Sequence, residues 1–259
     1  MLMAVFSANA QTRKPKPVKK TTTPVIQPTP APSPEPTPAI ETAVKKNERP
    51  RDNSSDQTKN GPAGNHYTPN YFYEFARPGF DIPRILIEHD EAGHGRISFK
   101  KGESEEMITD PINLSTVTMT RLRDTLTALD FLNSTTVYQY QKDYSHLGNN
   151  TITVKRDGKQ RTVKYNWTEN KDALELMNLY RRIANEYIWK FDINIARQNQ
   201  PLETPGMMDH LIDYVDRGEI SDPPQMIPFL TELSNDERLP LMARNRAVKL
   251  IKSIEKPKK

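Results

Sequence analysis

The strongest constraint on the fold is a hairpin pattern followed directly by an amphipathic pattern, within residues 151–191. Apolar and polar side chains alternate on both sides of an Asp-Gly pair at 157–158, which is typical of two antiparallel strands joined by a tight turn. The second strand carries Val163, Tyr165 and Trp167 at alternate positions. Because alternate residues of a strand share one face, we expect all three side chains in the core.

A long helix should follow the hairpin, since apolar residues recur every three or four positions after Lys171. This stripe consists of Leu176, Tyr180, Ile183, Tyr187 and Phe191. We expect it to cover the apolar face of the hairpin, with Ile183 and Trp167 as core partners. The pattern predicts a hydrophobic core and indicates no chemistry.

Similar patterns precede this unit. An aromatic run at 70–75 predicts a first strand, and alternating apolar residues around a polar turn at 89–95 predict another hairpin. Helical spacing at 115–132 predicts a helix, with Ser115 or Thr116 as its N-cap. Two strand-strand-helix units predict an α+β fold, in which both helices pack on one face of an antiparallel sheet.

The C-terminal part, residues 200–256, is predicted to be a small helical region after an α+β domain at 66–199. Three short helical patterns lie at 208–215, 226–233 and 241–254. The last, with Asp236 before it and Arg244 within it, resembles the second helix of a HEAT repeat. One such helix pair cannot form a solenoid, so we expect it to pack on the α+β domain or to bind a partner.

The segment 11–65 differs sharply in composition from the rest. It holds 11 of the 22 prolines and little apolar surface, so we expect a disordered, Pro-rich tether. Its ten basic and five acidic residues give a net +5, which leaves about −1 for the remainder, with 27 basic and 28 acidic residues. That balance argues against nucleic-acid recognition by the folded part. The tether could contact anionic surfaces or serve as a soluble, self-repelling tail.

Residues 1–10 end in Ala8-Asn9-Ala10, the small-x-small pattern that signal peptidases accept. The apolar stretch before it is short, so we expect a truncated signal peptide, with an ordinary N-terminus as the alternative. A bacterial periplasmic or secreted location follows from this prediction. No later stretch approaches 18 apolar residues, so no transmembrane segment is expected after signal removal.

The order of elements resembles a family of uncharacterised exported bacterial α+β domains, over about residues 71–188. That family carries a paired-Cys motif of the form Arg-x-x-Cys-x-Gly-x-Cys-Pro-x-Tyr. The corresponding stretch, residues 77–85, keeps an Arg, a Gly and a Pro in order and lacks both Cys. The resemblance implies a fold and an export route, and no site residue.

Three groups of ionisable residues are candidate sites. His89 and His94 are five positions apart across a Gly-containing turn, which differs from the spacing of a zincin, so a solvated turn is expected. Glu103, Glu105 and Glu106 lie in a polar loop, and Ser145-His146 lacks the context of a nucleophilic triad. No catalytic, cofactor-binding or metal-binding residue is therefore assigned.

Aromatic residues offer one further site. Tyr138, Tyr140 and Tyr144, in a segment expected to be a loop with one short strand at most, could line a ligand groove with Tyr165 and Trp167. Register with Val163 favours the core for the last two.

The leading functional hypothesis is an exported, envelope-associated, non-catalytic binding or structural module, whose partner is an unknown protein or envelope polymer. The alternative is a small periplasmic hydrolase with loop-borne carboxylates. A pocket that gathers at least two of Glu105, Glu106, Asp143 and His146 would favour the hydrolase.

Overall fold

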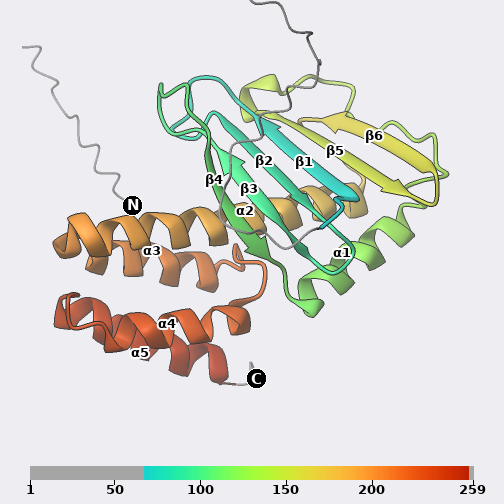
Figure 1. The fold of residues 1–259 in the computed structure, drawn as a ribbon. Coiled ribbons are helices and arrows are strands. Elements are labelled where there is room, and N and C mark those ends of the chain that lie inside the picture. Colours follow the sequence, from blue (N-terminus) through green and yellow to red (C-terminus); the bar gives the residue numbers. More distant parts are fainter. Residues whose placement is uncertain (1–66, 257–259) are drawn as a thin grey trace, which may run out of the picture. The chain divides into compact units, whose positions relative to one another are not determined.

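A computed structural model describes residues 67–256. The expected signal peptide at 1–10 and the expected tether at 11–65 lie outside this range. Within it the chain forms a mixed α+β structure with a helical C-terminal region, which confirms the predicted fold class (Figure 1).

The sheet has six strands in the order β4-β3-β2-β1-β5-β6, and every neighbouring pair is antiparallel. The strands are β1 (Tyr71–Ala76), β2 (Arg84–His89), β3 (His94–Phe99), β4 (Ile108–Asn113), β5 (Asn149–Arg156) and β6 (Lys159–Tyr165). The hairpin predicted from Thr151 is confirmed as far as Tyr165, because β5 pairs with β6 across a turn in which Asp157 and Gly158 have positive φ angles of 52° and 73°. Such angles match the right-handed twist of the flanking strands.

Five α-helices accompany the sheet: α1 (Thr116–Ala128), α2 (Lys171–Asn199), α3 (Thr204–Asp216), α4 (Ile227–Asn235) and α5 (Leu241–Glu255). Three short 3₁₀ turns lie at Ser145–Leu147, Pro201–Glu203 and Pro223–Met226. The side chain of Ser115 caps α1, since its Oγ accepts from the Thr118 N–H at 3.1 Å. This helix ends before the predicted limit of 132, because Asp130 adopts a left-handed φ of 41°.

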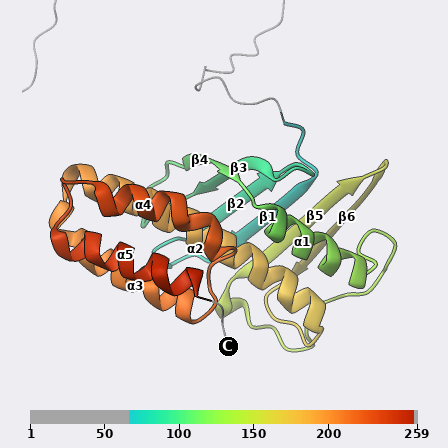
Figure 2. The same cartoon turned by 90° about the horizontal axis from the view of Figure 1, so that it is seen from below.

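Two hydrophobic cores share the helix α2. The sheet core contains the buried face of all six strands, α1 and the N-terminal part of α2, where Leu176, Tyr180 and Ile183 are fully buried. The helical core begins on the same helix with Trp189 and Ile193. Its other members are Met208, Leu211, Ile220, Met226, Leu230, Leu233, Leu239, Ala243, Ala247 and Leu250. The C-terminal helices therefore pack on the end of α2, as Figure 2 shows.

Polar contacts reinforce the junction between α2 and the helical region. Trp189 donates its indole N–H to the backbone carbonyl of Met207 on α3 at 2.9 Å. The carboxylate of Glu186 is fully buried, and it accepts from Lys190 Nζ at 2.6 Å and from Ser221 Oγ at 2.5 Å. A buried carboxylate requires such partners, so these contacts fix the segment after α3 against α2.

The strand β4, which follows the polar loop of Glu103, Glu105 and Glu106, was not predicted. In the structure Ile108–Asn113 pairs with β3, and Pro111 lies opposite Arg96. Proline cannot donate to a sheet ladder and is tolerated only where no partner strand needs its N–H. As the first strand in the sheet order, β4 has β3 as its one neighbour, so Pro111 fits there.

The expected core position of Trp167 was wrong. The strand β6 ends at Tyr165, and Trp167 is only partly buried outside the sheet core. Its ring packs against Tyr140 and Tyr144, at centroid distances of 4.6 and 5.6 Å. The chain leaves the sheet at Asn166, whose backbone N–H and side chain bond to the 139–144 loop instead. Strand alternation therefore stops two residues before the tryptophan.

The burial of α2 predicts a large contrast between two isoleucines of one helix. Ile183 is 0% exposed in the sheet core, whereas Ile195 is 46% exposed. We expect Ile183→Ala to lower the free energy of unfolding by about 2–5 kcal/mol and Ile195→Ala to change it by about 0.5 kcal/mol or less. Urea midpoints at an unchanged slope measure both values. Equal losses would contradict the assignment of Ile183 to the core.

Candidate functional site

A cleft of about 640 Å³ lies where the sheet, α2 and α3 meet. Strands β1 and β2 contribute Tyr73, Phe75 and Ile85, and the connection between them contributes residues 79–82. The remaining lining comes from α2 (Arg181, Ala184, Asn185, Ile188, Trp189 and Asp192) and from α3 (Met207, His210 and Tyr214). Figures 1 and 2 show α3 running beside the C-terminal half of α2.

Helix geometry explains why these residues face one space. On α2 the lining residues from Arg181 to Asp192 are spaced one, three or four apart, so they form a second stripe beside the one that covers the sheet. On α3 the spacing from Met207 to Tyr214 follows the same rule. Both helices are held by buried residues on their other sides, so the walls of the cleft are preformed.

The third wall is the connection between β1 and β2. Arg77 and Pro83 close its base, because the Arg77 N–H donates to the Pro83 carbonyl at 2.8 Å. Gly79, with a φ of 82°, allows the turn that places Phe80 at the edge of the cleft. The guanidinium of Arg77 stacks over the Phe80 ring, 3.0 Å from its centroid. This cation–π contact orients an aromatic side chain that is still 40% exposed.

Charges of both signs line the cleft. The carboxylate of Asp192 forms an ion pair with Lys101. Across residues 67–256, no hydrogen bond or ion pair engages the side chains of Arg181 and Asp81. The next residue on α2 differs, since Arg182 bonds to Glu175 at 2.7 Å. Burial raises the pKa of Tyr73, and the nearby positive charge of Arg181 partly offsets that rise.

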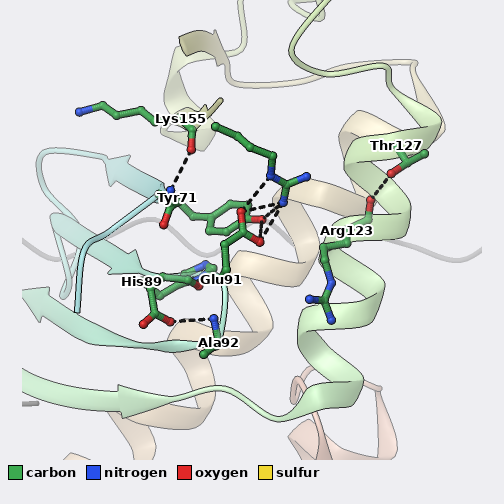
Figure 3. Close-up of polar contacts among 10 residues, drawn as sticks. Tyr71, His89, Glu91, Ala92, Arg123, Thr127 and Lys155 are labelled. Carbon is green, nitrogen blue, oxygen red and sulfur yellow. Dashed lines mark hydrogen bonds and ion pairs between the residues drawn. The ribbon is translucent and has the colours of Figure 1, made fainter. Parts of the chain in front are cut away.

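A separate polar network lies at the other end of β1 and β2. Tyr71 donates its hydroxyl to Glu91 at 2.8 Å, as Figure 3 shows, and Arg156 binds the same carboxylate at 2.9 Å through Nε. Arg156 also contacts the Tyr71 hydroxyl. The side chains of Arg156 and Glu91 are 38% and 42% exposed, so this ion pair links the β5 end to the β2–β3 turn at the surface.

The expectation of a solvated turn was wrong for His89. This residue ends β2 and is 0% exposed, with its ring stacked on Tyr71 at 4.7 Å. Its Nδ1 lies 2.9 Å from the Asp90 carbonyl and its Nε2 lies 3.2 Å from the Tyr180 hydroxyl. A neutral imidazole satisfies both contacts, with Nδ1–H donating and Nε2 accepting. The alternation Ile85, Ile87, His89 was the sequence signal for this burial.

His94 lies apart from His89. It is the first residue of β3 and is exposed, and its Nδ1 lies 3.6 Å from Oδ2 of Asp90. Gly95, the register partner of His89, has no room for a Cβ, which would meet His89 at 2.7 Å. Between Tyr67 and Lys256, no group of three or more His, Cys, Asp or Glu residues could hold a metal ion.

The carboxylates considered for a hydrolase are not gathered in the cleft. Glu103, Glu105 and Glu106 are exposed, and Asp143 accepts from the Asn166 amide at 2.5 Å. Ser145 and His146 lie in an exposed 3₁₀ turn, where the His146 ring packs on Tyr144. None of these residues lines the cleft between the sheet, α2 and α3, and Glu103 and Glu105 line a neighbouring hollow beside Asp81.

The aromatic residues suggested as a groove divide into two groups. Tyr138 and Tyr165 are buried in the sheet core. Tyr140, Tyr144 and Trp167 pack on one another in a small surface cluster. The aromatic residues that do share a cleft, such as Phe75, Phe80 and Tyr214, come from elements that packing alone brings together.

Comparison of the sequence with protein-family models and with curated proteins finds no match. The resemblance to exported bacterial domains therefore stays a prediction. Among the helices of residues 67–256, none has an apolar stretch long enough to cross a membrane.

Burial of His89 predicts a pH-dependent stability. It lowers the pKa of His89 from 6.5 to about 4, because the charged ring would lose its hydration. The unfolded chain binds this proton below pH 6.5, whereas the folded chain does not until about pH 4. The contribution of neutral His89 to the free energy of unfolding is therefore fully present above pH 6.5. As the pH falls to 4, the free energy of unfolding decreases by about 3 kcal/mol, because the unfolded chain binds a proton that the folded chain does not.

Urea unfolding between pH 7.5 and 4.5 measures this effect. His89→Gln should flatten the pH dependence in that window, whatever its stability at pH 7.5. His94→Gln, which changes an exposed ring, should keep the profile of the unchanged protein. Parallel profiles for all three proteins would show that His89 is not the group that titrates on unfolding.

Proposed function

We propose that this chain is a non-catalytic binding module of the bacterial envelope, and that the cleft between the sheet, α2 and α3 is its ligand site. The observation that carries the proposal is the lining of this cleft. Aromatic and aliphatic side chains from the sheet, the β1–β2 connection, α2 and α3 surround it, while Arg181 and Asp81 provide charges without partners among the described residues. Apolar walls with a few convergent polar groups are typical of ligand sites.

Size and stiffness also support a binding role. A volume of about 640 Å³ falls within the range of about 300–1,000 Å³ that small-molecule sites occupy. The walls that the sheet, α2 and α3 form are held in place by two hydrophobic cores. A preformed site of this kind loses little conformational entropy when its ligand binds.

The envelope location rests on the N-terminal sequence. The Ala8-x-Ala10 pattern supports export, and a Pro-rich segment at 11–65 would let the folded part reach a partner at some distance. The hydrolase alternative has no comparable support, because its candidate acids Glu105, Glu106 and Asp143 do not line the cleft.

An anionic aromatic probe, 1-anilinonaphthalene-8-sulfonate, tests the cleft as a binding site. In a Trp167→Phe background, Trp189 is the one remaining tryptophan and lines the cleft, so energy transfer to the probe reports binding there. We expect saturable one-to-one transfer. Phe80→Ala should weaken it about tenfold, because a partly exposed ring contributes roughly 1–2 kcal/mol when a ligand covers it.

Val137→Ala is the matched control, since Val137 is 80% exposed and lies outside the cleft. It should leave the affinity unchanged. Absence of saturable transfer, or equal affinity of the Phe80→Ala and unchanged proteins, would overturn the proposed site.

A further inference from the structure

The cleft has oppositely charged ends. Its lining on α2 runs from Arg181 to Asp192, eleven residues apart, which corresponds to about 16 Å along the helix axis. Asp81 belongs to the Asp192 end, because its backbone carbonyl accepts from Gly102 at 2.7 Å and the adjacent Lys101 pairs with Asp192. Arg181 therefore lies at one end of the cleft and Asp81 at the other.

These two charges are available to a ligand. Two neighbouring charged residues on α2 are engaged: Arg182 with Glu175, and Asp192 with Lys101. In the described part of the chain, neither Arg181 nor Asp81 has such a partner. A guanidinium offers two parallel N–H donors that match a carboxylate, and a carboxylate such as that of Asp81 accepts from an ammonium group.

The middle of the cleft is mainly apolar, with Ile188, Ile85 and Phe75 among its walls. His210 and Tyr214 of α3 also line it, and between Tyr67 and Lys256 their side chains make no hydrogen bond. They could pair with polar groups of a bound chain. A ligand that fits must carry an anion at one end and a cation at the other, with apolar groups and hydrogen-bonding groups between them.

We infer that the ligand is a short peptide with free termini, bound in an extended conformation with its carboxylate at Arg181 and its ammonium group at Asp81. An extended chain rises about 3.3 Å per residue, so four or five residues match the roughly 16 Å of α2 that line the cleft. A fatty acid would satisfy Arg181 and leave Asp81 without a partner, and a polyamine would do the reverse. This inference rests on the proposed function and specifies the ligand of the same site.

Retention of peptide libraries on the immobilised full-length chain tests the inference. Three tetrapeptide libraries of the same composition are compared by mass spectrometry: one with free termini, one with amidated carboxyl ends and one with acetylated amino ends. We expect retention of the free library, enriched in peptides with bulky apolar residues at the second and third positions. Amidation or acetylation should weaken the affinity of the best-retained peptide about tenfold.

Variants assign each end of the peptide. Arg181→Gln should lower the affinity for the peptide with free termini about tenfold. It should also remove the difference in affinity between the acid and amide forms of the peptide, whereas Arg182→Gln should change neither affinity. Asp81→Asn should remove the difference between the free and acetylated forms. All three residues are at least partly exposed, so folding is expected to persist, and thermal unfolding confirms it.

Two results would overturn the peptide assignment. One is retention of no library member, and the other is equal binding of the free and blocked forms to the unchanged protein. If the fluorescent probe still binds the cleft with the Phe80 dependence described above, the proposed function survives and only the ligand class fails. If neither probe nor peptide binds, both fail.

Discussion

The structure depends on one helix that must be buried on two sides at different places along its length. The first half of α2 buries Tyr180 and Ile183 against the sheet, and its second half buries Trp189 and Ile193 against α3, α4 and α5. Fully burying a side chain of this size contributes about 1.5–3 kcal/mol, so neither half can separate without a large loss. The buried carboxylate of Glu186 adds a polar link near the change of side. Because α2 holds both cores, it also fixes the cleft between them.

Much of the fold could be predicted from local sequence patterns. Strand alternation and the Asp-Gly turn identified the 151–165 hairpin, and spacing of three and four identified α2 from its first residue, Lys171. The failures occurred where packing overrides local pattern. Pro111 argued against a strand at 108–113, although an edge strand tolerates proline. Trp167 fits the alternation of β6 in the sequence, although the strand ends at Tyr165. His89 looked like part of a polar turn, although its strand register places it beneath α2, beside Tyr180.

The candidate site was far less predictable than the fold. Its residues come from β1, β2, the connection between them, α2 and α3, and only tertiary packing brings the strands and helices together. The sequence contained one usable signal, a second stripe on α2 in which Arg181 and Asp192 flank the apolar Ile188. The conspicuous ionisable residues lie elsewhere, since Glu105, Asp143 and His146 do not line this cleft.

Native-state hydrogen exchange along α2 tests the central claim most directly, namely that one helix joins both cores into a single unit with a preformed cleft. The account predicts that amides around Ile183 and around Ile193 exchange only through the same global unfolding event, with equal free energies of opening and equal dependence on denaturant. Exchange of the second half of α2 together with α3, α4 and α5, at a clearly lower free energy than the first half, would contradict it. The helical region would then open independently, and the cleft would have no fixed wall.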